Sequence, residues 1–226
     1  MLQFNLSKGF VLRGQAQSAS WDDPESIIRA AMDCYRKNYW QDQPYHVEVL
    51  SEKGTVRGTL APVLEEYGVP FRVMHGFGSA TSLNDLAQMS QDADKPVVLL
   101  YVGDFDPSGM YMSEMDLPER LSRYGASADL TIKRVALTAD DVVGLPSFAA
   151  DTKSKDGRYK WYVQQYGDHC WELDAMNPVD LRERVEQSIR EYLDLDAWDH
   201  MIGVEAVERE SMKSVLTTWL NKRPAI

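Results

Sequence analysis

Cysteine and histidine are scarce in this sequence. The two cysteines, Cys34 and Cys170, lie far apart, which offers no disulfide framework and favours a reducing cytoplasm. The four histidines are scattered without a zinc spacing, so any bound metal is expected to have oxygen ligands. No apolar run approaches the roughly 20 residues of a membrane helix. The N-terminus lacks the apolar core and cleavage site of a secretory signal, so we expect a cytoplasmic protein that is not embedded in a membrane.

Basic residues are also in the minority. Lys and Arg number 24 against 35 Asp and Glu, which gives a net charge of −11. This balance argues against a protein that coats DNA through a broad basic face. It does not exclude an enzyme that holds nucleic acid locally, because an acidic metal site adds negative charge that a bound cation would offset.

Apolar strand-like runs alternate with helical patterns through the middle of the chain. This order predicts an α/β, Rossmann-like fold with a mostly parallel sheet of about four to five strands and right-handed crossovers. The predicted strands are 46–51, 70–75, 96–103 and 129–137, with 169–173 as a possible fifth. The predicted helices between them are 53–68, 83–93 and one ending near 124. Gly68 is a natural helix stop, and Pro62 indicates a kink or a late start.

The same patterns suggest three parts. Residues 1–43 form an N-terminal extension with one helix at 24–39, preceded by a hairpin or an extended segment. Residues 44–194 form the core, which ends in an amphipathic helix at 178–194. Residues 195–226 form a C-terminal helical segment of one or two helices.

Three carboxylates follow two of the predicted strands. Glu52 comes directly after the first strand, and Asp104 and Asp106 come directly after the third. Parallel sheets bind ligands at the carboxyl ends of their strands, so the three acids meet at one edge if these strands are neighbours. Such a group can bind a hard cation through oxygen. The alternative is that these acids cap the helices that follow.

The placement of these acids resembles the Toprim domain, which topoisomerases, bacterial primases and OLD-type nucleases share. The string GDFDPSGMYM looks most like the A subunit of type IIB topoisomerases and the related meiotic double-strand-break transesterase. The string WELDAMNPVDLRERVEQSI resembles phage and mobile-element proteins with such a core. The resemblance covers residues 44–194. It implies a Toprim fold and Mg²⁺-dependent (or Mn²⁺-dependent) phosphodiester chemistry on nucleic acid, with DNA the expected partner and RNA left open.

The resemblance also implies roles for individual residues. Asp104 and Asp106 would hold the metal, and Glu52 would be a general acid/base or a further ligand. Glu172 and Asp174, after the possible fifth strand, could complete a second metal site, although Asp174 could equally cap the helix that follows.

One segment of this acidic chain is distinctly basic. Residues 151–162 interleave aromatic side chains with four cationic ones, which are Lys153, Lys155, Arg158 and Lys160. They could grip phosphates while the aromatic rings stack on bases, or the segment could be a solvated loop. Lys53, next to Glu52, could likewise contact phosphate or simply extend into solvent.

The chain departs from the topoisomerase pattern before its first strand. About 45 residues precede that strand, which is short for the winged helix that carries the cleaving tyrosine. Tyr35 and Tyr39 lie there among apolar neighbours and are interpreted as packing residues. A metal-activated water, or a tyrosine from a partner subunit, would fill the gap. We therefore expect a nuclease or nicking enzyme.

Two other readings remain open. One is a non-catalytic or partner-dependent Toprim subunit of a topoisomerase-like or defence complex, which would bind DNA or regulate a partner. The other, ranked lowest because no zinc ribbon is present, is a primase-like nucleotidyl transferase. Type IIB relatives are dimers, so a homodimer is expected by analogy.

Overall fold

A computed structural model describes residues 10–12, 15–17, 20–74 and 80–222. The chain divides into two compact units. One is Trp40–Leu195, and the other combines Met1–Tyr39 with Asp196–Ile226.

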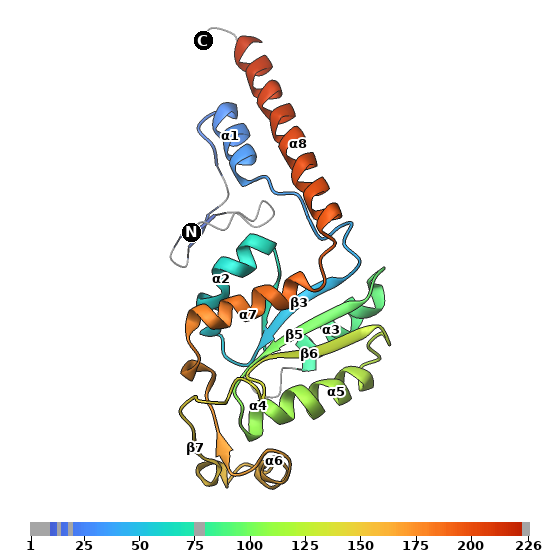
Figure 1. The fold of residues 1–226 in the computed structure, drawn as a ribbon. Helices are drawn as coiled ribbons and strands as arrows, with labels where there is room; N and C mark the ends of the chain where they lie inside the picture. The colour runs from blue at the N-terminus through green and yellow to red at the C-terminus, as the bar shows by residue number, and fades with distance from the viewer. Residues whose placement is uncertain (1–9, 13–14, 18–19, 75–79, 223–226) are drawn as a thin grey trace. The chain divides into compact units, whose positions relative to one another are not determined.

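A four-stranded parallel sheet forms the centre of the Trp40–Leu195 unit, as the alternating pattern predicts (Figure 1). Its order is β4-β3-β5-β6. The strands are β3 (His46–Ser51), β4 (Phe71–Val73), β5 (Val97–Val102) and β6 (Leu130–Ala136). All six residues of β5 are buried, which explains its nearly uninterrupted apolar sequence. The α/β class with a parallel sheet is therefore confirmed.

Helices cover both faces of this sheet. On one face α2 (Val56–Tyr67) contacts α7 (Pro178–Arg190), and on the other α3 (Ala80–Asp92) contacts α5 (Leu117–Arg123) (Figure 1). Alternate residues of β5 belong to the α3–α5 core because successive side chains of a strand point to opposite faces. These residues are Val97, Leu99 and Tyr101.

The ends of α2 follow its sequence. The helix starts at Val56, three residues after the predicted start, and Pro62 lies inside it. It ends at Gly68, which has a φ of 62° and donates its N–H to the carbonyl of Leu64. A positive φ costs glycine little, so the predicted stop is confirmed.

The segment 169–173 does not join the parallel sheet as a fifth strand. Only β8 (His169–Cys170) is extended, and it pairs antiparallel with β7 (Phe148–Ala149). Trp171 then makes a single antiparallel bridge to Phe105, and the chain turns into η3 (Leu173–Ala175). The segment stays outside the parallel sheet because its residues lie beside β7 and beside the turn that follows β5, and they pair there instead. The segment between β7 and β8 holds η2 (Ala150–Lys153) and α6 (Tyr159–Tyr166).

The second unit contains α1 (Pro24–Cys34), α8 (Leu195–Lys222) and the antiparallel pair β1 (Phe10–Leu12) and β2 (Gln15–Gln17). The predicted helix to residue 39 ends at Cys34, because Tyr35 is already extended and Lys37 donates its backbone N–H to Glu205 of α8. Tyr39 donates its hydroxyl to the same carboxylate at 2.7 Å. Among the described residues, no helix combines the length and apolar character needed to cross a membrane.

Candidate active site

Glu52, Asp104 and Asp106 lie at the carboxyl ends of two neighbouring strands. β3 and β5 pair in parallel along their whole length, and Ser51 is opposite Val102. Glu52 follows the end of β3, and Asp104 and Asp106 lie in the turn between β5 and α4 (Pro107–Tyr111). The expected adjacency of the first and third strands of the core is therefore present, and it brings the three acids to one edge of the sheet.

Lys53 lies among three carboxylates at this edge. Its Nζ is 2.9 Å from Oδ1 of Asp104, 3.5 Å from Oδ2 of Asp174 and 3.7 Å from Oε2 of Glu172. Burial alone would lower the pKa of Lys53, but the three carboxylates outweigh burial and raise it. Acids from two distant parts of the sequence thus surround one positive charge.

Asp104 is held from two sides. Its Oδ1 accepts the backbone N–H of Leu173 at 2.7 Å in addition to its contact with Lys53. Burial raises the pKa of Asp104, the bonds from Leu173 and Lys53 partly oppose that rise, and the charge of Asp106 adds to it. Its charged form is therefore costly at this position, and a nearby cation stabilises it.

Asp106 caps the helix that follows it and also contacts a lysine from another part of the chain. Its Oδ1 caps α4 by accepting the N–H of Gly109 at 2.8 Å. Its Oδ2 lies 3.3 Å from Nζ of Lys153, which belongs to η2. Burial opposes the charge of Lys153, but Asp106 outweighs burial and raises the pKa of Lys153. A basic residue of segment 151–162 therefore reaches the acidic edge.

Glu52 accepts a hydrogen bond from the hydroxyl of Tyr101 at 2.9 Å. Burial raises the pKa of Glu52, the bond from Tyr101 opposes the rise, and the charges of Asp106 and Asp104 add to it. Burial also raises the pKa of Tyr101, which keeps its proton available for this bond. A carboxyl group with a raised pKa beside other acids is suited to proton transfer.

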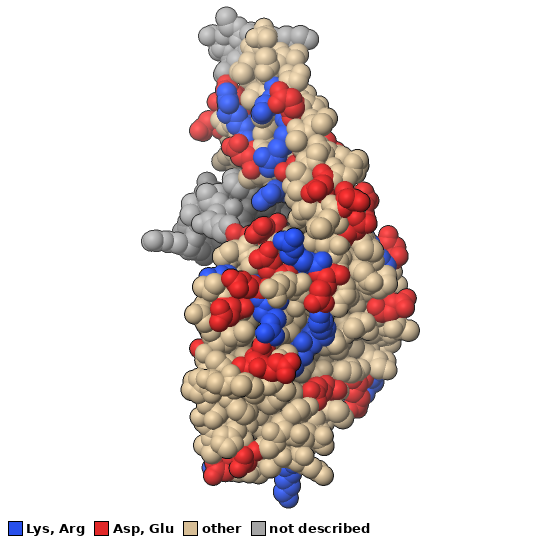
Figure 2. Space-filling view, in the orientation of Figure 1, with Lys and Arg blue, Asp and Glu red and all other residues tan. Residues whose placement is uncertain are grey.

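The other predicted basic residues differ in their surroundings. Arg158 makes a two-bond ion pair with Asp156, with both nitrogen–oxygen distances at 2.6 Å. The charges of Glu52 and Asp106 also contribute to the raised pKa of Arg158, after its bond with Asp156. Lys155 and Lys160 are exposed and form no ion pair within the described part of the chain. On the face drawn in Figure 2, basic and acidic atoms are interspersed rather than gathered into one basic field.

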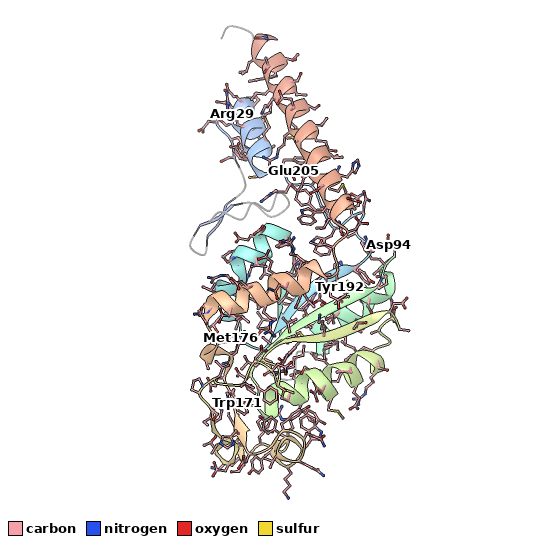
Figure 3. The ribbon with its side chains drawn as sticks, viewed as in Figure 1. Arg29, Asp94, Trp171, Met176, Tyr192 and Glu205 are labelled. Atoms are coloured by element: carbon pink, nitrogen blue, oxygen red, sulfur yellow. The ribbon has the colours of Figure 1, made fainter. Side chains whose placement is uncertain are left out.

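Glu172 and Asp174 lie between Trp171 and Met176, both labelled in Figure 3. Their side chains are 53 % and 73 % exposed, and both contact Lys53. The expectation that Asp174 caps α7 is wrong: Asn177 takes that position and accepts the N–H of Val179 at 2.8 Å. The side-chain oxygen of Asn177, directly before Pro178, is a favourable N-cap. Asp174 contacts Lys53 at the acidic edge.

Two residues of this site were not singled out from the sequence. Tyr101 and Arg134 are cross-strand neighbours in β5 and β6, and the guanidinium of Arg134 lies 5.3 Å from the centre of the Tyr101 ring. Both are embedded in strand sequences that are otherwise mostly apolar. The signal in the sequence was a polar side chain inside a predicted strand: Tyr101 in the strand that precedes Asp104, and Arg134 in the next strand.

The donor set suits a hard divalent cation. Within the described residues, no group of three or more His, Cys, Asp or Glu side chains is arranged to hold a metal ion. Three carboxylates nevertheless surround the single ammonium of Lys53. Carboxylate oxygens are the ligands that Mg²⁺ and Mn²⁺ prefer, so the acids of this edge fit such a cation in their chemistry. They are Asp104, Asp106, Glu172 and Asp174.

Comparison with known proteins adds no support to the Toprim resemblance. No model of a known protein family matches the chain, and no curated protein matches it either. The Toprim resemblance therefore rests on Glu52 and on the strings GDFDPSGMYM and WELDAMNPVDLRERVEQSI alone.

Proposed function

We propose that the Trp40–Leu195 unit binds Mg²⁺ or Mn²⁺ at its acidic edge and cleaves phosphodiester bonds of nucleic acid, as a Toprim-type nuclease or nicking enzyme. The observation that carries the proposal is that Asp104, Glu172 and Asp174 all contact the ammonium of Lys53, with Asp106 and Glu52 beside them.

The side chains present divide the chemistry among themselves. A bound divalent cation would supply charge stabilisation for the phosphoryl oxygens. Asp104 and Asp106 would hold the cation, with Glu172 and Asp174 available for a second one. Lys53 and Lys153 would turn their ammonium groups to phosphate oxygens once the carboxylates are engaged.

Glu52 is the best placed group for proton transfer. The hydroxyl of Tyr101 fixes one of its oxygens. Its raised pKa makes it a stronger base than an ordinary glutamate, so it would accept a proton from an attacking water. Hydrolysis by water needs no tyrosine nucleophile, which agrees with the hydroxyls of Tyr35 and Tyr39 donating to Glu208 and Glu205 of α8.

The test is cleavage of a supercoiled plasmid with Mg²⁺ or Mn²⁺ by the wild type and by Asp104→Ala/Asp106→Ala. We expect metal-dependent nicking or linearisation that the double variant loses. The matched control is Asp92→Ala/Asp94→Ala, which removes two exposed acids before the start of β5 and should cleave normally. Equal cleavage by the wild type and Asp104→Ala/Asp106→Ala would reject the proposed site.

A second candidate function has its own observation. Lys53 and Lys153 already neutralise the buried acids, as they would in a scaffold that binds no metal. The unit would then be a non-catalytic or partner-dependent subunit, with the partner supplying a winged helix or a tyrosine. Absence of cleavage, together with a stable complex or homodimer in light scattering, would favour this candidate.

A further inference from the structure

Arg134 is a half-buried cation with no part in the chemistry proposed above. It lies in edge strand β6, and no carboxylate forms an ion pair with it among the residues that the structure describes. Its ring neighbour is Tyr101, the residue that donates to Glu52. A guanidinium placed this way calls for an explanation, because burying a charge without a counter-ion is costly.

Four of the five hydrogen bonds of Arg134 go to one turn, the segment 103–113. A guanidinium has five N–H donors, and here all five are used. Nη1 donates to the carbonyl of Gly109 at 2.9 Å and to the hydroxyl of Ser113 at 2.7 Å. Nη2 donates to the carbonyls of Gly103, at 3.1 Å, and of Asp104. Nε donates to the carbonyl of Leu137 at 2.6 Å.

The four acceptors of Nη1 and Nη2 bracket the segment that carries both aspartates. Gly103 and Asp104 begin the turn after β5, while Gly109 and Ser113 lie in the helical segment that follows it. One rigid fork therefore ties the two ends of the turn together. The same guanidinium packs on the ring of Tyr101, whose hydroxyl donates to Glu52. Arg134 therefore contacts both the turn that carries the two aspartates and the residue that holds Glu52.

We propose that Arg134 is the positioning residue of the acidic edge, which sets the geometry of the 103–113 segment and thereby its affinity for a divalent cation. This inference rests on the proposed metal site for its affinity component only. Lysine cannot replace arginine here, because an ammonium has three donors and no planar fork.

The test uses the full chain and two readouts, with Arg134→Met, Arg134→Lys and Lys133→Met compared with the wild type. Lys133 is the matched control because it precedes Arg134 in β6. Its ammonium pairs with Glu191, at the end of α7, and makes no ion pair with the acids of the 103–113 segment. The first readout is hydrogen exchange of the 103–113 amides in metal-free protein. We expect exchange about tenfold faster or more in both Arg134 variants, and wild-type exchange in Lys133→Met.

The second readout is the Kd for Mn²⁺ by calorimetry. We expect affinity to fall at least about tenfold in both Arg134 variants and to stay unchanged in Lys133→Met. Wild-type exchange of the 103–113 amides in Arg134→Met, or complete rescue of exchange by Arg134→Lys, would overturn the inference. If the wild type binds no Mn²⁺, the proposed function fails, while the exchange readout still decides the role of Arg134. If Arg134→Met does not fold, Arg134→Lys decides both readouts.

Discussion

At the scale of single residues, the acidic edge is a place where charges are paired across large sequence separations. Lys53 contacts acids of the β5–α4 turn and of the segment before α7. Lys153 contacts Asp106 from a third part of the chain. Each lysine therefore occupies a position that a metal cation would compete for.

This competition gives a prediction for Lys53→Met. Removing the ammonium leaves Asp104, Glu172 and Asp174 without their shared cation, so Mn²⁺ should bind about tenfold more tightly, a gain of about 1.4 kcal/mol. The measurement is calorimetric titration of metal-free protein. Lys155→Met, which changes an exposed lysine of the basic segment, should leave the Kd unchanged. Weaker Mn²⁺ binding by Lys53→Met would mean instead that Lys53 holds the carboxylates in place.

At the scale of elements, the β5–α4 turn is built with little spare room. A Cβ at Gly109 would lie only 2.3 Å from the backbone carbonyl oxygen of Asp104. A backbone atom cannot rotate away as a side chain can. The glycine therefore permits the close approach that places Asp104 and Asp106 on the same turn.

Two glycine-to-alanine changes should consequently have opposite effects. Gly109→Ala should destabilise the protein by about 1–3 kcal/mol and weaken Mn²⁺ binding, because the turn must open to admit the methyl group. Gly58→Ala, in α2 with no atom within 4 Å of the added Cβ, should stabilise by about 0.5–1 kcal/mol. Urea unfolding measures both. A Gly109→Ala protein as stable as the wild type would refute the close-packed turn.

At the scale of the whole molecule, a net charge of −11 would restrict how the proposed enzyme holds nucleic acid. Besides Arg134, the described cations near the acidic edge are Lys53, Lys153 and Arg158, and they contact acids or lie in their field. The molecule therefore has the means for a few local phosphate contacts but not for a long electrostatic track.

Binding of duplex DNA should accordingly depend only moderately on salt. With three phosphates neutralised, a plot of log K against log salt should have a slope of about −2.7. Fluorescence anisotropy with Ca²⁺ in place of Mg²⁺ measures it. Lys153→Met should reduce the slope by about 0.9, whereas Lys160→Met should not change it. A wild-type slope of −6 or steeper would contradict a local grip.

The sequence by itself determined the parts of this protein that depend on local pattern. The uninterrupted apolar run of β5 identified a central strand, because a strand buried on both faces needs apolar residues at every position. Gly68 identified the end of α2, because glycine readily adopts the positive φ found there. The position of Glu52, Asp104 and Asp106 after their strands followed from the same pattern together with the topology of parallel sheets.

Only the tertiary structure decided which distant groups meet. Tyr101 and Arg134 look like ordinary strand residues until the register of β5 and β6 places them side by side. The segment at 169–173 has strand-like composition, yet it pairs with β7 and brings Glu172 to Lys53. Contacts of this kind depend on how the chain returns through space, because short-range patterning contains no information about the partner that a side chain will find.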